Sequence, residues 1–349
     1  MTCSSGILPA RFETVEALEE FLSRPREDVI QALRGLEGDL MILGVGGKMG
    51  PTLAALAKRS SDEAGLGKRV IGVSRFSTPG LREELERWGV ETIPCDLLDE
   101  DALRALPQTP NIIYMAGMKF GATGREPQTW AMNAYLPGMV ARHFRHSRVV
   151  LFSSGNVYPF APVIHGGCTE DTLPAPIGEY AQSVLGRERV FEHFALQYDL
   201  PSVLFRLNYA VELRYGVLLD IARQVWKGEP IDLSMGHFNC IWQGDANAYA
   251  LRALSLAEVP PRILNVTGPE TISVRSVALH FGALLGKEPT FMGQESPDAL
   301  LSNAGLAHRL FGYPQVPLGA VIEWVADWVR SGGPTWDKPT KYQVRDGRF

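Results

Sequence analysis

With 349 residues, 45% of them hydrophobic, this chain can bury a substantial core in one large domain or two closely joined ones. Its formal net charge is −5 and its lysines and arginines are scattered, so nucleic acid is not an expected partner. No basic leader, no apolar run of about 18 residues and no C-x-x-C pair is present. We therefore expect a soluble cytoplasmic protein that neither spans a membrane nor holds a metal.

The first elements in chain order are two short amphipathic segments. Apolar residues recur at three- and four-residue spacing over 13–22 and 26–36, which predicts two helices before the main fold. From residue 39, short apolar runs alternate with helical segments, one of which is expected over 130–144. The predicted strands are 39–44, 68–75, 90–96, 111–117 and 148–155. This alternation requires crossover connections, so we predict an α/β fold with a doubly wound parallel (Rossmann) sheet.

The sequence GVGGKMG follows the first predicted strand directly and opens the first helix of that sheet. Glycines at 44, 47 and 50 would permit a tight turn, bring backbone amides close to a pyrophosphate and let the helix pack closely on the strand. A glycine triplet is a weak signal, and a structural turn is the alternative. The strand before it and the helix after it favour a dinucleotide cofactor bound by Gly44, Gly47, Lys48, Met49 and Gly50.

The end of the second predicted strand bears on which dinucleotide is bound. An acidic residue there would hold the adenosine ribose hydroxyls, whereas an arginine accommodates a 2′-phosphate. The run VSRFS places Arg75 at this point and no acid. We therefore expect NAD(P), with NADP favoured over NAD; a solvated loop arginine is the alternative.

After about residue 200 the alternation weakens and short apolar segments mix with helices. We divide the chain into an N-terminal helical appendage (1–38), a dinucleotide-binding Rossmann domain (39–208), a mainly substrate-binding lobe with interleaved segments (209–330) and a C-terminal arm (331–349). The Gly, Pro and charge content of the arm predicts an extended conformation.

Several motifs over about residues 39–330 resemble the extended short-chain dehydrogenase/reductase family, which contains the NAD-dependent nucleotide-sugar epimerases and dehydratases. They are G-x-x-G-x-x-G in the glycine loop, CDLLD, IIYMAGMK, FSSGNVY, the approach TEDTLPAPIGEY, and FRLNYAV, in which the family's R-x-x-N segment lacks one residue. The resemblance implies that Asp96 and Leu97 lie beside the adenine and that Ala116, Gly117, Lys119 and Asn133 lie along the cofactor. It also implies that Ser154 and Tyr180 are catalytic.

The segment GEYAQSVLGRE departs from the family at one position. The family pattern is Y-x-x-x-K, in which the lysine holds the nicotinamide ribose and lowers the pKa of the tyrosine, but here Val184 follows Tyr180 by four residues. A phenol with pKa near 10 exchanges protons poorly at neutral pH unless a positive charge lies close by. Three explanations stay open: Lys119 or Arg187 supplies the charge, Tyr180 acts slowly as a neutral donor, or the chain is a binding protein without catalysis.

The expected function is hydride transfer between a nicotinamide and the carbinol carbon of a sugar or sugar derivative. Tyr180, assisted by Ser154 and Lys119, would exchange the hydroxyl proton. Asn156 and Tyr158 could each meet a sugar hydroxyl or only support the site. Epimerisation, reduction and dehydration are not distinguished, and the substrate could be nucleotide-linked or free. The resemblance also implies a homodimer formed through helices that include 180–196, and the alternative function is an inactive dinucleotide sensor.

Overall fold

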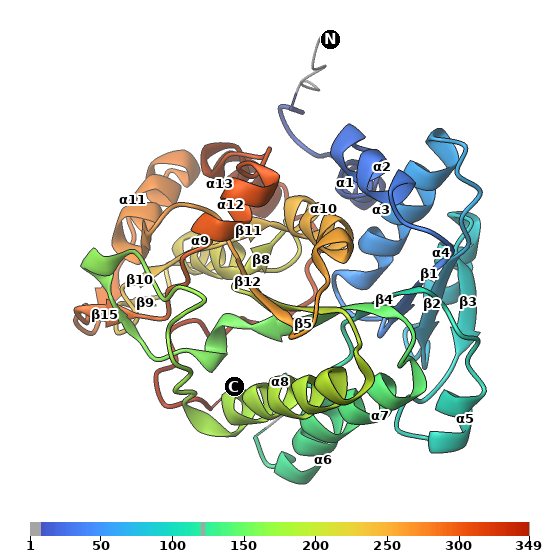
Figure 1. Ribbon diagram of the computed structural model, residues 1–349. Coiled ribbons are helices and arrows are strands. Elements are labelled where there is room, and N and C mark those ends of the chain that lie inside the picture. Colours follow the sequence, from blue (N-terminus) through green and yellow to red (C-terminus); the bar gives the residue numbers. More distant parts are fainter. Residues whose placement is uncertain (1–7, 120–122, 349) are drawn as a thin grey trace.

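The computed structural model describes residues 8–119 and 123–348, which are built around a seven-stranded parallel sheet (Figure 1). The α/β doubly wound fold expected from the sequence is confirmed, and each of the five predicted strands is present. The strands of the sheet are β1 (Leu40–Leu43), β2 (Val70–Ser74), β3 (Glu91–Pro94), β4 (Asn111–Tyr114), β5 (Arg148–Ser154), β7 (Ser202–Leu207) and β12 (Arg262–Val266).

The strand order β12-β7-β5-β4-β1-β2-β3 creates a reversal at the middle of the sheet. From β1 the chain moves outward through β2 and β3, then returns to the other side of β1 with β4 and continues to the opposite edge. Leu40 of β1 therefore pairs with Val70 on one side and Asn111 on the other. Ligands of such sheets bind in the crevice at the carboxyl ends of the strands next to this reversal.

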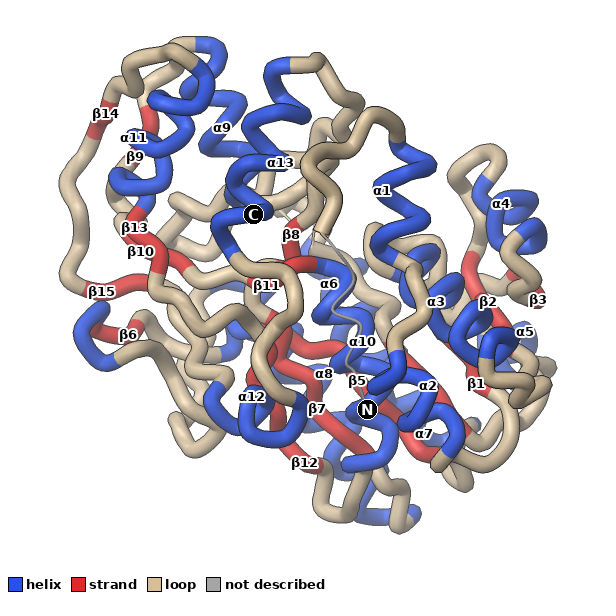
Figure 2. Tube along the Cα trace, turned by 90° about the horizontal axis from the view of Figure 1, so that it is seen from above, coloured by secondary structure: helices blue, strands red, loops and turns tan. Residues whose placement is uncertain are grey.

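Helices cover both faces of the sheet, as Figures 1 and 2 show from two directions. Successive residues of β1 point to opposite faces: Leu40 and Ile42 belong to one core and Met41 and Leu43 to the other. The first face is packed by α2 (Glu27–Arg34), α3 (Gly50–Glu63), α4 (Leu81–Arg87) and α10 (Gln243–Ala253). The second is packed by α5 (Glu100–Arg104), α7 (Leu136–His143) and α8 (Gly178–Tyr198).

A separate apolar core lies beside the sheet and builds the lobe. It joins α1 (Val15–Leu22), α9 (Val217–Lys227), α11 (Val274–Leu285) and α13 (Leu318–Arg330). Short strand pairs complete the lobe: β6 (Ala161–Pro162) with β15 (Asp298–Ala299), β8 (Ala210–Val211) with β11 (Ile241–Trp242), β9 (Ile231–Asp232) with β14 (Phe291–Met292), and β10 (His237–Phe238) with β13 (Ile272–Ser273). The strand β12 and the helix α10 also fall within residues 209–330, but they pack in and against the main sheet. This segment therefore contributes to both cores. The helix α12 (Gly305–Phe311) packs beside β12 and contributes to the core on the first face of the sheet.

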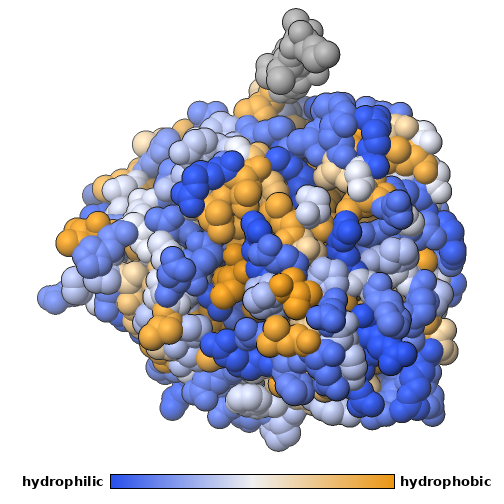
Figure 3. Space-filling model, viewed as in Figure 1, coloured by the Kyte–Doolittle hydropathy of each residue, from blue (hydrophilic) through white to orange (hydrophobic). Residues whose placement is uncertain are grey.

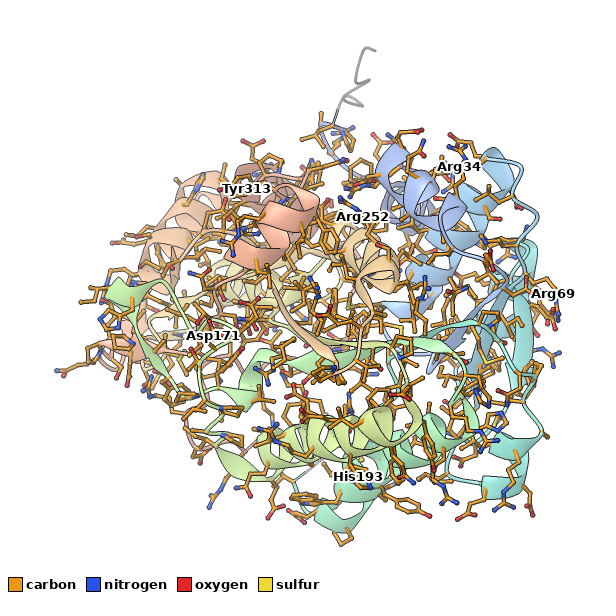
Figure 4. The ribbon with its side chains drawn as sticks, in the orientation of Figure 1. Arg34, Arg69, Asp171, His193, Arg252 and Tyr313 are labelled. Atoms are coloured by element: carbon orange, nitrogen blue, oxygen red, sulfur yellow. The ribbon has the colours of Figure 1, made fainter. Side chains whose placement is uncertain are left out.

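Charged contacts fasten the second N-terminal helix, α2, to α10. Arg26 donates to the buried carboxylate of Asp245 at 2.6 Å, and Arg252 donates to Asp28 at 2.9 Å. Figure 4 shows Arg252 on the side of α10 that faces α2. Because removing one partner of a buried pair leaves an uncompensated charge, these contacts anchor α2 on α10.

The helix predicted over 130–144 is interrupted, which the sequence analysis did not foresee. The chain forms α6 (Glu126–Trp130), then a π-helical turn over Ala131–Tyr135, then α7. Pro137 at the start of α7 has no N–H to donate to the carbonyl of Asn133, four residues earlier. That carbonyl instead accepts a hydrogen bond from Arg187 of α8 at 3.3 Å. The π turn thus directs Asn133 towards α8 and the sheet edge.

The C-terminal arm runs across the lobe without forming a helix or strand in its described part. Thr340 donates to Asp220 of α9 through its N–H at 2.7 Å and its hydroxyl at 2.6 Å, and the Tyr342 side chain packs near Phe238 in the lobe core. The arm ends where Gly347 lies against the start of α8. It therefore connects the lobe to the helix that carries Tyr180.

On the face shown in Figure 3, hydrophobic residues gather towards the middle of the view and hydrophilic residues predominate at its edges. Within residues 8–119 and 123–348, no helix combines the length and the apolar character needed to cross a membrane.

Candidate active site

A cavity of about 970 Å³ lies at the carboxyl ends of the strands, between the sheet and the lobe. Its walls come from the glycine loop, the ends of β2, β4 and β5, the start of α8, the segment around β8, and the C-terminal arm. This is the crevice that the strand reversal between β1 and β4 predicts.

Most of the residues that the sequence analysis assigned to the site line this cavity. They are Gly44, Gly47, Lys48, Met49, Arg75, Asp96, Leu97, Ala116, Gly117, Lys119, Ser154 and Tyr180. Gly50 and Asn133 lie behind the cavity wall, so any contact of theirs with a cofactor stays a prediction. Asn156 lines the cavity, whereas Tyr158 is buried in the core and donates its hydroxyl to Asn265 at 2.9 Å.

The glycine loop has the backbone geometry that a pyrophosphate site requires. Gly44 adopts a φ of 88°, and a Cβ there would lie 2.6 Å from the backbone nitrogen of Ala116. A Cβ on Gly50 would collide with the carbonyl of Val45, so this glycine lets α3 pack tightly against the loop. Gly47 is exposed, and a Cβ there would meet no more than ordinary contact with Gly44. The loop surface at Gly47 therefore leaves room for a ligand to approach the backbone at the start of α3.

Asn133 fixes the loop that follows β4. Its side-chain oxygen accepts the Met118 N–H at 2.8 Å, and its side-chain nitrogen donates to the Met118 carbonyl at 2.9 Å and to the Ser183 hydroxyl at 3.0 Å. The Ser183 hydroxyl in turn donates to the carbonyl of Tyr180 at 2.7 Å. Asn133 thus links the loop that carries Gly117 and Lys119 to the first turn of α8.

Arg187 projects from α8 into the wall of the cavity and is almost fully buried. Its guanidinium donates to the Phe152 carbonyl at 2.7 Å and to the Asn133 side-chain oxygen at 2.8 Å. Gly117 makes room for it, because a Cβ at that position would collide with the guanidinium. A guanidinium stays charged at any pH at which the protein works, so Arg187 is a fixed cation in this wall.

The Tyr180 phenol faces the cavity and interacts with Ser154. Burial raises its pKa, while the Arg187 charge and a hydrogen bond with the Ser154 side chain act in the opposite direction. Ser154 ends β5, and its hydroxyl also accepts the Asn156 N–H at 3.2 Å. Arg187 and Ser154 therefore favour the anionic form of a phenol that burial alone would keep protonated.

Val184 lies outside the cavity wall. Its side chain is 1% exposed and packs with Val157, Tyr158 and Cys168 beneath the Tyr180 ring. The position that a Y-x-x-x-K pattern would assign to an ammonium is thus filled by an apolar cluster, and the cations of the site come from elsewhere.

Two lysines extend into the cavity. The Lys119 ammonium lies 5.7 Å from the ring centroids of both Tyr180 and Tyr209, and burial lowers its pKa to about 8. The Lys48 ammonium lies 3.0 Å from the ring centroid of Tyr215, on the lobe side. Burial, followed by repulsion from Lys119 and Lys338, lowers the pKa of Lys48 to about 6.

The sequence analysis missed part of the site. The segment around β8 adds Asn208, Tyr209, Arg214 and Tyr215, and the arm adds Trp336 and Lys338. The motif FRLNYAV was the available signal for Asn208 and Tyr209, and no motif pointed to Arg214 and Tyr215. For the arm residues, the tripeptide W-D-K in a segment rich in Gly and Pro was the only sequence signal, and it does not indicate where the arm packs.

The chain has been compared with known proteins by sequence and by structure. Residues 40–218 match the model of the NAD dependent epimerase/dehydratase family. No match was found among curated protein sequences.

Solved structures share the fold at low sequence identity. UDP-glucose 4-epimerase from Thermotoga maritima is 17% identical, with a TM-score of 0.69 over 84% of this chain and 99% of that one. UDP-glucuronic acid 4-epimerase from Bacillus cereus, solved with a UDP-sugar and NAD, is 18% identical with the same TM-score and the same coverage. MoeE5 in complex with UDP-glucose and NAD is 20% identical, with a TM-score of 0.66 over 84% of this chain and 99% of that one. Since the family model covers more than half of the sequence, this chain belongs to the NAD-dependent epimerase/dehydratase family.

Proposed function

We propose that this protein transfers a hydride between a nicotinamide dinucleotide and the carbinol carbon of a sugar or sugar derivative, as an epimerase or an oxidoreductase. The observation that carries the proposal is the pairing of Tyr180 with Ser154 in the cavity that the glycine loop also lines. An acid/base phenol is thus within the same enclosed space as a backbone suited to a pyrophosphate.

The residues present fit a dinucleotide. The loop around Gly47 would hold the pyrophosphate, Asp96 and Leu97 would lie beside the adenine, and the β4 loop from Ala116 to Lys119 would follow the cofactor. A bound nicotinamide would supply the acceptor or donor of the hydride. Exposed Arg75 at the end of β2 supports NADP over NAD as our proposal, since it could pair with a 2′-phosphate.

The chain's own residues would move the proton. When the substrate hydroxyl is oxidised, the Tyr180 oxygen takes its proton; when a ketone is reduced, Tyr180 returns it. Ser154 donates a hydrogen bond to the phenolate or to the substrate oxygen, which stabilises the charge that forms there. In epimerisation the hydride comes back to the opposite face of the ketone, and in simple reduction the product leaves.

Two cations would replace the lysine that the family pattern places at position 184. Arg187 supplies the fixed charge that favours the phenolate, because its effect opposes that of burial on the Tyr180 pKa. Lys119 lies over the Tyr180 ring and is protonated below about pH 8, so it could contact the nicotinamide ribose or the substrate. This division of labour assigns to two residues what one lysine does in the family pattern.

A homodimer forms part of the proposal. Trp130, Tyr135 and Leu196 are large hydrophobic side chains exposed on α6, the π turn and α8. Their exposure on adjacent elements supports pairing through this face.

The test combines binding with turnover. Calorimetry with NAD, NADH, NADP and NADPH should show binding of a dinucleotide, and a panel of keto-sugars with the reduced form should reveal oxidation of the nicotinamide. Replacing Tyr180 by phenylalanine or Ser154 by alanine should leave binding intact and lower the rate by about 10²–10⁴-fold and about 10-fold or more, respectively.

The alternative is a dinucleotide sensor without catalysis. It is favoured by one observation: burial raises the Tyr180 pKa, and Val184 offers no ammonium to lower it. Tight dinucleotide binding with no turnover of any sugar, before and after Tyr180→Phe, would support the sensor and refute the enzyme.

A further inference from the structure

We propose that the substrate is a compact anionic sugar, a sugar acid or sugar phosphate without a nucleotide, whose negative group is bound by lysines at the end of the cavity closed by the C-terminal arm. This inference rests on the function proposed above. It concerns which substrate enters the site, and it assigns to the arm the selection of that substrate.

Three lysines from three different segments line the same cavity. Lys48 comes from the glycine loop, Lys119 from the β4 loop and Lys338 from the arm. Lys119 and Lys338 are close enough to repel the Lys48 ammonium and contribute to the fall of its pKa to about 6. Gathering like charges in a half-buried space costs free energy in the empty site, and an anion bound among them would offset that cost.

The Lys48 side chain reaches from the glycine loop to the lobe. It lies on the Tyr215 ring, 3.0 Å from the centroid, and the Tyr215 ring stacks on Trp336 of the arm with centroids 6.5 Å apart. Arg214 lies over the other aromatic of this pair, 4.9 Å from the Trp336 centroid, but its charge is balanced by ion pairs with Glu19 of α1 at 2.6 Å and Glu212 at 3.1 Å. The positive charge at the lobe end of the cavity is therefore that of the lysines, beside aromatic faces against which a sugar ring can pack.

The arm limits the length of what can bind there. Beyond Lys338 it is held on the lobe by the Thr340 bonds to Asp220, by the buried Tyr342, and by Arg345, which donates to Asp298 at 2.5 Å and lies over Phe160. Enclosed sites for one drug-sized ligand usually measure about 300–1,000 Å³. A cavity of about 970 Å³ that would also hold a dinucleotide leaves space for a small molecule, and Trp336 and Lys338 of the arm form part of the wall around it.

The experiment uses the full-length protein saturated with whichever dinucleotide it binds. Calorimetry and initial-rate measurements are made with D-glucuronate, D-gluconate and D-glucose 6-phosphate as compact anions, D-glucose as a neutral sugar, and UDP-glucose as a nucleotide-linked sugar. Each is repeated with Lys338→Met, and with Lys341→Met as the matched control, because Lys341 is also exposed on the arm but does not line the cavity.

At least one compact anion should bind more tightly than D-glucose and UDP-glucose. Lys338→Met should weaken that binding, or raise KM, about ten-fold while kcat changes less than about two-fold, and Lys341→Met should leave both unchanged. Comparing the two acids with the phosphate identifies the anionic group.

Three results would overturn the inference: tighter binding of UDP-glucose, turnover of neutral sugars with no effect of Lys338→Met, or binding of none of the three anions. In each of these cases dinucleotide binding and sensitivity to Tyr180→Phe would still support the proposed function. A protein that binds no dinucleotide would instead refute the proposed function itself.

Discussion

Replacing Arg187 by methionine should raise the pKa of the Tyr180 phenol, because the guanidinium opposes the effect of burial on that pKa. Tyr180 and Arg187 lie seven positions apart on α8, so their Cα atoms are separated by about 10 Å along the helix axis, and the side chains can bring the charged groups to roughly 5–10 Å. At an effective dielectric of about 20, a unit charge at that range is worth about 1.7–3.3 kcal/mol in favour of the phenolate, so its removal should raise the Tyr180 pKa.

Ultraviolet absorbance follows the ionisation of tyrosines. Subtracting the spectrum of the same protein with the added substitution Tyr180→Phe isolates the absorbance of the Tyr180 phenol, and no substrate is required. Arg187→Lys keeps the positive charge and should leave the pKa close to that of the parent. Arg189→Met removes an exposed charge two residues along the same helix, paired with Glu192, and should have no effect.

Stability must be measured in parallel. Removing Arg187 deprives the Phe152 carbonyl and the Asn133 side-chain oxygen of a donor, which should lower the free energy of unfolding by about 2–4 kcal/mol. The reasoning would be refuted by an Arg187→Met protein that remains folded and whose Tyr180 titrates within about 0.3 pKa units of the parent.

Three further outcomes follow from the site. Gly47→Ala should leave the free energy of unfolding within about 0.5 kcal/mol of the parent, because its Cβ would make only an ordinary contact with the Gly44 carbonyl, and it should weaken dinucleotide binding because the residue lines the cavity. Gly50→Ala should lower the melting temperature, because its Cβ would collide with the Val45 carbonyl. Equal effects of the two substitutions in calorimetry and thermal melts would contradict this. Val184→Lys should destabilise the fold by about 2–4 kcal/mol, since it places an ammonium in an apolar cluster, and should not raise turnover; a large gain in rate would mean that the native site lacks a working cation. Lys48, with its pKa lowered to about 6, is mostly neutral at pH 7, so an anion bound beside it should raise that pKa and take up a proton. Calorimetry in two buffers of different ionisation enthalpy should detect the uptake and its loss in Lys48→Met, and binding should weaken as pH rises above about 6; uptake that persists in Lys48→Met would exclude this lysine as its source.

Five of the seven strands could be predicted from the sequence because most of them, β1, β2, β4 and β5, are continuous apolar runs that are buried on both faces and separated by helical segments; β3, at the edge of the sheet, is only partly buried. The five expected strands fall where β1 to β5 are found, and the glycine loop follows β1 as expected. A short, continuous apolar run indicates a strand that is buried on both faces, and alternation of such strands with helical segments is typical of a parallel sheet covered by helices on both sides.

The π turn and the role of Arg187 could not be predicted by the same means. Pro137 signals that a helical bond is lost, but not that the Asn133 carbonyl will find its donor fifty-four residues further on in Arg187. Arg187 was one of the two candidate cations in the sequence. Its burial and its hydrogen bonds depend on tertiary contacts that no local pattern encodes.

The path of the C-terminal arm could not be predicted from the sequence either. Its composition predicts an extended conformation, but the path that places Trp336 and Lys338 in the cavity is set by individual contacts such as the Thr340 bonds to Asp220. Extended segments have no periodicity from which a partner surface can be inferred.

The central claim is that a dinucleotide lies across the carboxyl edge of the sheet with its reactive ring facing Tyr180. A crystal structure of the protein with its bound dinucleotide tests this most directly. We predict the phosphates on the backbone around Gly47, the nicotinamide beside the Tyr180 hydroxyl, and Lys119 or Arg187 within about 4–6 Å of the phenol or the ribose. A dinucleotide bound elsewhere, or a Tyr180 hydroxyl turned away from the nicotinamide, would contradict the account.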